Sequence, residues 1–336
     1  RLIGDGGSMS DKPRVTLVAP GAELDQALPA GPPMEAARTL LARATAVAAG
    51  QDNIDHLLFH LFGVPDPHFG DLPVAAVGAV GEGLSNGDGW WLRADPVHIT
   101  PNQGRLVLLG NRELDLSDEE AEALAEPVRE SLAEAGAELH VAAPTRWYLR
   151  FEQPPRITTR ELARVSGGDI AGCLPDGPDA KYWHALLNEV QMVLHACPAN
   201  QRREAAGRHT ANSVWFWGGG WAPKVPGGWQ GLWSTDPVAR GLARLSAVPV
   251  SDAEHLSDAL AGVNGGAVLA VTEPCSTACG EWLERLENDW CVPLLKALRQ
   301  RQLSEVTLYL GQWAYTVTPR RLLRFWRRQP KLVHSV

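Results

Sequence analysis

The chain has 336 residues, of which 45% are hydrophobic and 21% charged, and its formal net charge is -8 at pH 7. This acidic balance argues against a nucleic-acid-binding domain, which is usually basic, and no run approaches the roughly 18 apolar residues that span a bilayer. Five cysteines without the spacing of a disulfide framework suit a reducing compartment. We therefore expect a cytoplasmic protein of about two domains, with residues 1–8 as a vector remnant outside the fold.

Apolar runs and helical spacing, taken in chain order, predict an alternation of strands and helices. The expected order is a strand at 14–18, helices at 33–49 and 52–62, strands at 90–93 and 105–109, a helix at 116–135, strands at 138–142 and 147–151, a helix at 181–196, a strand at 213–217, helices at 236–245 and 254–261, a strand at 267–271, a helix at 279–301 and a strand at 306–310.

The predicted helix at 116–135 has residues typical of both a helix start and a helix end. Ser117 stands at the N-cap with Glu120 three residues on, which is the arrangement of a capping box, and Gly136 provides the stop. A pair of strands is expected on each side of this helix. Residues 85–165 are therefore predicted to form a β-β-α-β-β segment.

Alternating strands and helices elsewhere predict an α/β fold, with a mostly parallel sheet covered by helices on both faces. The β-β-α-β-β segment interrupts that alternation, so we interpret it as an insertion. The expected organisation is a discontinuous core of residues 14–84 and 166–330 and an inserted, smaller α+β cap of residues 85–165, with a cleft between them.

The stretch from Asn188 to Pro223 is the most specific motif, and it resembles the archaeal-type cofactor-independent phosphoglycerate mutases. Residues in register with the pattern of that family are Pro198, Asn200, Arg203, Gly207, Ala211, Asn212, Trp215, Trp217, Gly218, Gly220 and Pro223. Residues 91–99 and 188–195 are similar to the RpfE-type regulatory proteins of proteobacteria. The resemblance implies an alkaline-phosphatase-like core.

The resemblance also implies a reaction centre that this chain lacks. Mutases of that superfamily use a phosphorylated serine and two divalent metals, which neutralise charge on the transferring phosphoryl group. Their metal ligands and nucleophile fall here on residues without hard-ligand side chains: Pro20, Gln51, Cys275, Cys279 and the pair Gln312–Trp313. No bound metal or cofactor is therefore expected.

Polar residues in the matching segments are the candidates for a ligand site. The resemblance places arginines of this region on the substrate side of the mutase cleft, where guanidinium groups hold phosphate or carboxylate. An alternative is that Arg93 and Asp95 form a structural ion pair beside His98, and that Asn212 and Trp217 only cap and pack a strand. The predicted ligand-binding residues are Arg93, Asp95, His98, Glu189, His195, Asn200, Arg203, Asn212 and Trp217.

Two further features each allow a functional and a structural interpretation. Cys275 and Cys279 could form a soft-metal or redox pair, although their spacing is not CxxC, and small buried thiols are the alternative. Residues 320–331 interleave basic with apolar side chains, which suits either a surface for a protein partner or an ordinary terminal helix.

The sequence thus predicts a non-catalytic, phosphoglycerate-mutase-like protein with a regulatory role. It is expected to bind a small anionic or phosphorylated ligand or a protein partner, without nucleic acid and without a membrane span. The alternative is an active, metal-dependent mutase or phosphohydrolase, or an enzyme that uses the cleft for other chemistry.

Overall fold

The computed structural model describes residues 12–21, 34–51, 53–68, 70–251, 265–275 and 279–324. The chain divides into two compact units. The first unit comprises Arg1–Gly63 and Val225–Val336, and the second unit comprises Val64–Lys224. The second unit is therefore inserted into the sequence of the first.

The first unit contains a seven-stranded sheet in the order β2-β12-β11-β1-β10-β8-β9. The strands β1, β8, β9, β10 and β11 run parallel to one another, and β12 is antiparallel to both of its neighbours. This confirms the predicted α/β fold with a mostly parallel sheet. The strand bounds are β1 Arg14–Ala19, β2 Thr45–Ala48, β8 Gly231–Ser234, β9 Val250–Ser251, β10 Ala267–Val271, β11 Glu305–Leu310 and β12 Trp313–Val317.

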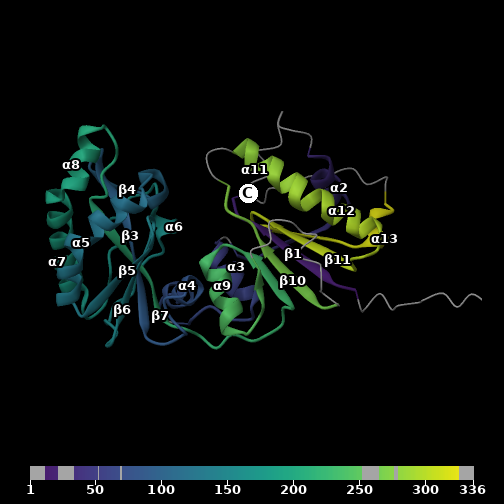
Figure 1. Cartoon of the computed structure of the whole chain (residues 1–336), viewed down its shortest axis with the longest axis horizontal. Helices are drawn as coiled ribbons and strands as arrows, with labels where there is room; N and C mark the ends of the chain where they lie inside the picture. Colours follow the sequence, from purple (N-terminus) through teal and green to yellow (C-terminus); the bar gives the residue numbers. More distant parts are fainter. Residues whose placement is uncertain are drawn as a thin grey trace, which may run out of the picture. The chain divides into compact units, whose positions relative to one another are not determined.

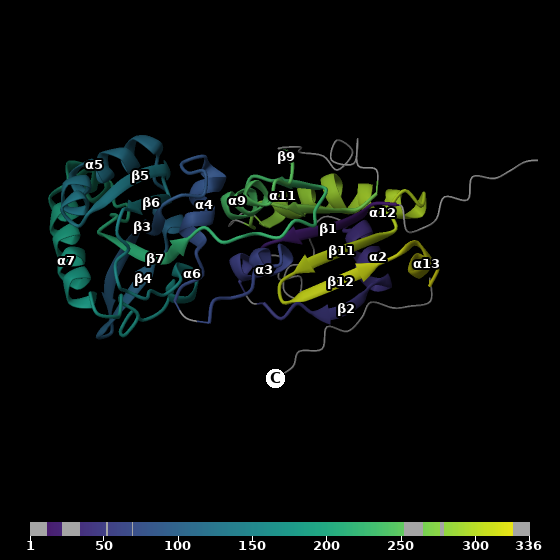
Figure 2. The same ribbon diagram turned by 90° about the horizontal axis from the view of Figure 1, so that it is seen from below.

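Helices α2 and α12 cover one face of this sheet, and Figure 2 shows α2 behind the strands β11 and β12. In β1, Val15 and Leu17 point into a core shared with α2 and α12. Val18 is also buried and faces the other side, because side chains alternate along a strand. Both faces of the sheet therefore need covering. The helices are α2 Glu35–Arg43, α3 Ile54–Leu61, α9 Pro237–Leu245, α11 Cys279–Arg285, α12 Val292–Arg299 and α13 Pro319–Leu322, with a π-helical segment, η3, at Leu286–Cys291.

Two predicted helices of the first unit are interrupted. The helix expected at 33–49 ends at Arg43, and Thr45–Ala48 instead pairs with β12, a contact between distant parts of the chain. The helix expected at 279–301 contains the π-helical η3. Pro293 follows it and cannot donate the usual helical hydrogen bond. The helix expected at 254–261 lies outside the described residues.

The second unit contains an antiparallel sheet in the order β4-β3-β6-β5, with β7 paired to β3. Figure 1 shows α5 and α7 on one side of this sheet and α4 on the other. The strands are β3 Trp90–Asn102, β4 Arg105–Leu109, β5 Ala137–Ala143, β6 Arg146–Phe151 and β7 Ser213–Trp221. The helices are α4 Val74–Glu82, α5 Asp118–Glu134, α6 Leu162–Val165, α7 Ala180–Ala196 and α8 Pro198–Ala205, with a 3₁₀ turn, η2, at Asn111–Leu114.

The predicted capping box of α5 is present, with the Ser117 hydroxyl accepting from the Glu120 N–H and the Glu120 carboxylate accepting from the Ser117 N–H. Pro198 begins α8 instead of only ending α7, since proline is well tolerated at the first position of a helix. Among the described residues, no helix combines the length and the apolar composition that crossing a bilayer would need.

The second unit is wider than the insertion of residues 85–165 that the sequence suggested. Residues 213–221 form β7, which pairs with β3 from Trp90 to Val97. Helix α7 packs with α5 in a single apolar core. Residues on both sides of the predicted insertion are therefore required to complete the second unit.

Strand β7 ends in glycines that allow neighbouring groups to approach closely. A Cβ atom on Gly219 would lie 2.6 Å from the Trp90 ring and 3.0 Å from a methyl carbon of Leu92. Both of these side chains are buried and cannot move aside freely.

We predict that Gly219→Ala lowers the free energy of unfolding by about 1–3 kcal/mol, because the added methyl overpacks this core. Urea denaturation measures the change. Gly228→Ala is the matched control, since a Cβ there meets nothing within 4 Å. Equal stability of the two variants would contradict this account of β7.

Candidate functional site

The carboxyl ends of the parallel strands in the first unit meet at one edge of the sheet. Strand β1 ends at Ala19, which pairs with Leu310 at the end of β11, and Val18 pairs with Val271 at the end of β10. In open α/β sheets, ligands bind outside this edge. We call it the carboxyl edge.

The residues that the resemblance aligns with the mutase metal ligands and nucleophile lie in segments at the carboxyl edge. The Cys275 N–H donates to the Pro20 carbonyl at 3.1 Å. The Ala49 N–H donates to the Gln312 carbonyl at 2.8 Å, which brings the segment containing Gln51 next to Gln312. The structure therefore brings together segments that are far apart in the sequence.

The side chains of Pro20, Gln51, Cys275, Gln312 and Trp313 include no carboxylate and no imidazole. The proline side chain offers no ligand atom, a thiol is a poor ligand for magnesium or manganese, and a glutamine amide offers only an uncharged carbonyl oxygen. Within the described ranges, no group of three or more His, Cys, Asp or Glu side chains is arranged to hold a metal ion. Asp52 and the side chain of Cys279 lie outside the described part, so the predicted alternatives for the Cys275–Cys279 pair stay open.

The predicted ligand-binding residues all belong to the second unit, where Arg93, Asp95 and Trp217 form one buried cluster. The Arg93 guanidinium donates to both Asp95 carboxylate oxygens, with Nη2 at 2.7 and 2.8 Å and Nε at 3.0 Å. The Trp217 indole N–H donates to Asp95 Oδ2 at 2.9 Å, and the Trp147 backbone N–H donates to Oδ1 at 3.2 Å. Asp95 is fully buried and Arg93 is 5% exposed.

The surroundings of Asp95 have opposing effects on the pKa of its carboxyl group. Burial raises the pKa of the Asp95 carboxyl, while the Arg93 charge and the N–H donors of Arg93, Trp217 and Trp147 act to lower it. The carboxylate has a guanidinium and several N–H partners, which is the condition for keeping a charge inside a protein. This arrangement is the structural ion pair given above as the alternative interpretation.

Tyr148 completes the cluster, although no motif in the sequence indicated this residue. The Arg93 guanidinium carbon lies 4.8 Å from the Tyr148 ring centroid and 5.1 Å from the Trp217 ring centroid. Tyr148 in β6 and Trp217 in β7 are the residues paired with Arg93 on its two sides. Burial raises the pKa of the Tyr148 hydroxyl well above its ordinary value, so the hydroxyl stays protonated.

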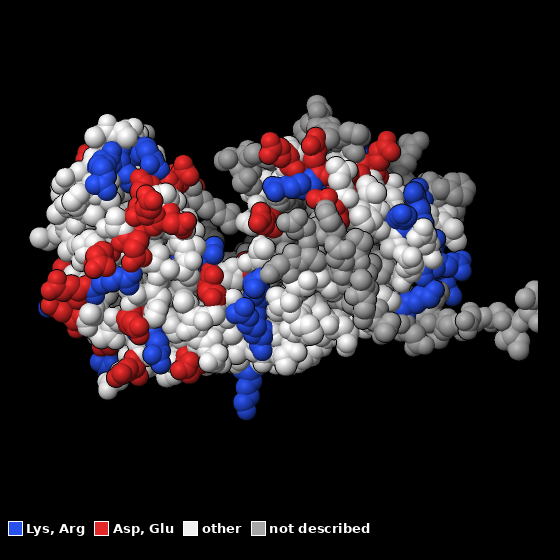
Figure 3. Space-filling model, viewed as in Figure 1, with Lys and Arg blue, Asp and Glu red and all other residues white. Residues whose placement is uncertain are grey.

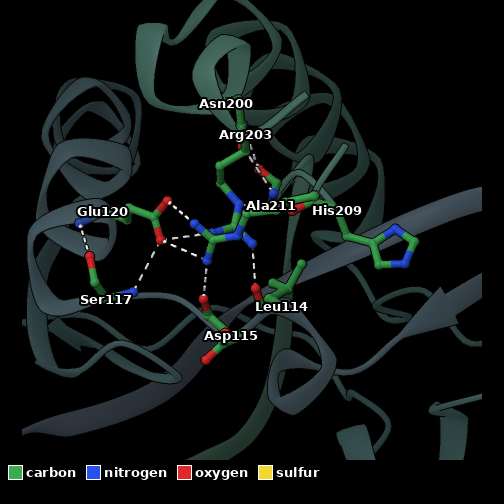
Figure 4. A network of polar contacts seen from close by, with 9 residues as sticks. Leu114, Asp115, Ser117, Glu120, Asn200, Arg203, His209 and Ala211 are labelled. Carbon is green, nitrogen blue, oxygen red and sulfur yellow. Dashed lines mark hydrogen bonds and ion pairs between the residues drawn. The ribbon is translucent and has the colours of Figure 1, made fainter. Parts of the chain in front are cut away.

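Arg203 forms a second network, shown in Figure 4. Its Nη1 donates to Glu120 Oε2 at 2.7 Å, its Nε donates to the His209 carbonyl at 2.8 Å, and its Nη2 donates to the Leu114 carbonyl. Arg208 donates to the other oxygen of Glu120 at 2.9 Å. Arg203 is 1% exposed, so its guanidinium already has protein partners and is shielded from a ligand in solution.

The Asn200 and Asn212 amides are likewise bound to backbone groups. Asn200 accepts from the Ala211 N–H at 3.0 Å and donates to the Leu194 and Ala211 carbonyls at 2.8 and 2.9 Å. Asn212 accepts from the Ile99 N–H and donates to the Ile99 carbonyl, both at 2.8 Å. These contacts fix the start of β7.

The remaining predicted residues are more accessible, and no hydrogen bond or ion pair of the described residues joins them to one another. His98 Nδ1 lies 2.8 Å from the Thr210 carbonyl, and its ring centroid is 5.0 Å from that of His209, which is exposed. Glu189 and His195 are exposed positions of α7. The structure therefore separates the predicted set into two buried networks, a partly accessible histidine pair and two exposed helix positions.

No protein-family model matches the chain. A probable 2,3-bisphosphoglycerate-independent phosphoglycerate mutase of Geobacter sulfurreducens is 28% identical over 134 residues, which are 40% of this chain and 34% of that protein. The 2,3-bisphosphoglycerate-independent phosphoglycerate mutase of Methanosarcina mazei is 38% identical over 60 residues, which are 18% of this chain and 15% of that protein. The matches thus span about a third or less of these curated relatives.

Among solved structures, the PH0037 protein from Pyrococcus horikoshii aligns with 91% of this chain and 87% of its own, with 15% identity and a TM-score of 0.52. The cofactor-independent phosphoglycerate mutase from Thermoplasma acidophilum aligns with 96% of this chain and 94% of its own, with 17% identity and a TM-score of 0.46. The chain shares its mixed α/β fold with the PH0037 protein. The chain is homologous to cofactor-independent phosphoglycerate mutases.

We predict that Arg93→Leu lowers the free energy of unfolding by about 3–5 kcal/mol, because it leaves the Asp95 carboxylate buried without its counter-charge. The double variant Arg93→Leu/Asp95→Leu should recover a large part of that loss. Urea denaturation measures both. Arg156→Ala, which breaks a solvent-screened pair with Asp179, is the control and should cost much less stability. A loss in Arg93→Leu no larger than in the control would rule out this role for the pair.

We predict that Glu120 makes the stability of the folded protein depend on pH. Burial alone would raise its pKa, but the Ser117 N–H and the Arg203 and Arg208 guanidinium groups lower it below the ordinary 4.5. A lowered folded-state pKa stabilises the protein above the unfolded-state value, and this stabilisation is lost as the pH falls through the folded-state value. The wild type should therefore lose more stability than Glu120→Gln on acidification from pH 7. Parallel losses in denaturation midpoint would contradict the prediction.

Proposed function

We propose that this protein is a non-catalytic relative of phosphoglycerate mutases that acts by binding, in a regulatory role. The observation that carries the proposal is the composition of the carboxyl edge. Pro20 and Gln312 occupy positions where the resemblance to the mutases expects metal ligands, and Gln51 occupies that of the nucleophile. Phosphoryl transfer by the mutase route needs metals and an ionisable nucleophile, and these side chains supply neither.

The hydrogen bonds of the second unit support a binding role in which some of the predicted residues support the site and others contact the ligand. Arg93, Asp95, Asn200, Arg203 and Asn212 would position the backbone and support a site, because their polar atoms already have protein partners. The accessible members of the predicted set would meet the ligand, which we take to be a small anionic or phosphorylated molecule or a protein segment. These members are His98, Glu189 and His195.

The regulatory part of the proposal rests on the motifs similar to RpfE-type proteins. Those motifs include Trp91–Ile99, which contains the Arg93–Asp95 pair, and Asn188–His195 on α7. Both lie in the second unit. This unit keeps the motif residues, whereas the departures from the mutase pattern fall at the carboxyl edge of the first unit.

The test is an assay of mutase activity and metal content on the full chain purified without chelator. We expect no interconversion of 2- and 3-phosphoglycerate with added manganese or zinc, and less than one equivalent of metal per chain by elemental analysis. The Methanosarcina mazei mutase is the positive control. Turnover that a chelator abolishes, together with about two metal equivalents per chain, would favour the active enzyme instead.

A further inference from the structure

Two histidine side chains lie together on the second unit: His98 in β3 and His209 in the segment before β7. Their ring centroids are 5.0 Å apart, and the ring planes are tilted by 46°. His209 is exposed and His98 is half-buried, so solvent reaches the pair. His209 was not among the predicted ligand-binding residues, because it lies far from His98 along the chain.

A hydrogen bond fixes the position of the proton on the His98 ring. His98 Nδ1 lies 2.8 Å from the Thr210 carbonyl oxygen and 3.5 Å from the Thr210 hydroxyl. A carbonyl oxygen only accepts, so Nδ1 carries the proton and Nε2 of the neutral ring keeps its lone pair. No hydrogen bond with a described residue occupies His98 Nε2 or either ring nitrogen of His209. Metal-binding histidines usually have this arrangement, in which the second ring N–H donates to a backbone carbonyl.

The backbone that carries the two rings is held by the polar networks of the second unit. Arg203 Nε donates to the His209 carbonyl at 2.8 Å. The Asn212 amide bonds to both backbone groups of Ile99, the neighbour of His98, at 2.8 Å. Groups that are already held in place lose little freedom when a ligand binds. The fold therefore preorganises the two histidines.

The separation of the rings fits two imidazoles that share one metal ion. With Zn–N bonds of about 2.0–2.1 Å and a roughly tetrahedral angle at the metal, two bound imidazoles have ring centroids about 5 Å apart. The observed separation of 5.0 Å agrees with this value. His209 is exposed, so its ring can turn a nitrogen towards His98 without displacing packed side chains.

The charge of the second unit favours a cation over an anion. This unit holds 22 Asp and Glu residues against 14 Lys and Arg residues, so the formal net charge of -8 falls on it. Figure 3 shows acidic side chains spread over the visible face of this unit, on the left of the view. Arg203 and Arg208 both bind Glu120, which partly offsets their repulsion of a cation near His209. A neutral imidazole with an unoccupied lone pair also attracts a metal ion and repels an anion.

Imidazole ligands select among the metal ions. Magnesium and calcium prefer oxygen ligands, whereas zinc, copper and nickel bind imidazole well. Among the described residues, no third His, Cys, Asp or Glu completes the pair, so the remaining coordination positions are open to water or to an incoming anionic ligand. An ion held by only two protein ligands exchanges readily, which agrees with the expectation of less than one metal equivalent in the purified chain.

We propose that His98 and His209 form an open two-histidine site for a divalent transition-metal ion of the zinc class. The inference goes beyond the proposed function, in which His98 contacts the ligand directly, and it does not depend on that function. The site lies in the second unit and not at the carboxyl edge. It would therefore serve a non-catalytic protein and an active mutase alike.

The test is a titration of the full chain, without a polyhistidine tag, with zinc chloride in competition with a chromophoric zinc chelator. At about pH 7.5 the imidazoles are neutral and free to bind the metal. We expect a zinc site whose affinity falls at least about tenfold in His209→Ala, the equivalent of 1.4 kcal/mol. His98→Ala should weaken the same site. His209 is exposed, so its removal should leave the fold intact, which circular dichroism establishes.

Two control variants remove other exposed histidines. His195→Ala changes α7 of the same unit, and His60→Ala changes the alternative pair His56 and His60, which lie one turn apart on α3. Both controls should keep the affinity of this site within about twofold, because distant positions act independently. Zinc binding that is unchanged in His209→Ala, equal weakening in His209→Ala and in both controls, or no zinc binding by the wild type would overturn the proposal.

Discussion

The buried ion pair between Arg93 and Asp95 is the interaction on which the second unit depends. Asp95 sits in β3 and receives N–H groups from Trp147 in β6 and Trp217 in β7, so one carboxylate joins three strands. Arg93 supplies the charge that makes this burial tolerable and lies against the Tyr148 and Trp217 rings. A pair of this kind costs a great deal of stability if half of it is removed. The alignment of these three strands therefore depends on the side chains of Arg93, Asp95 and Trp217.

Other buried polar residues of the second unit also join separate helices and strands through hydrogen bonds. Arg203 ties α8 to the capping box of α5 through Glu120, and the Asn200 and Asn212 amides hold the backbone around the start of β7. In the first unit the apolar pattern of the sheet is intact, while the carboxyl edge carries proline, amide and thiol side chains. A fold needs a distributed apolar pattern, whereas a functional site needs particular atoms at a few positions, so the two place separate demands on the sequence.

Much of the fold could be predicted because its signals are local. The capping box of α5 and the strands at 105–109 and 267–271 follow from neighbouring residues alone. Strand β2 was missed because its partner, β12, lies more than two hundred residues away, and η3 was missed because helical spacing does not register a π turn. At the candidate site, Arg93 and Asp95 could be paired from the sequence, since residues two apart share one face of a strand. Tyr148 could not, because its contact depends on strand pairing.

The α/β class and the homology to phosphoglycerate mutases could be predicted from the amino-acid sequence. These depend on patterns and identities that are written along the chain. Which charged groups are buried and paired became apparent only in the folded protein. Arg93 and Arg203 are buried in ion pairs, whereas Lys296 and Arg299 are exposed. The physical reason is that the state of a charged group depends on its burial and its partners, and both come from residues brought together by folding.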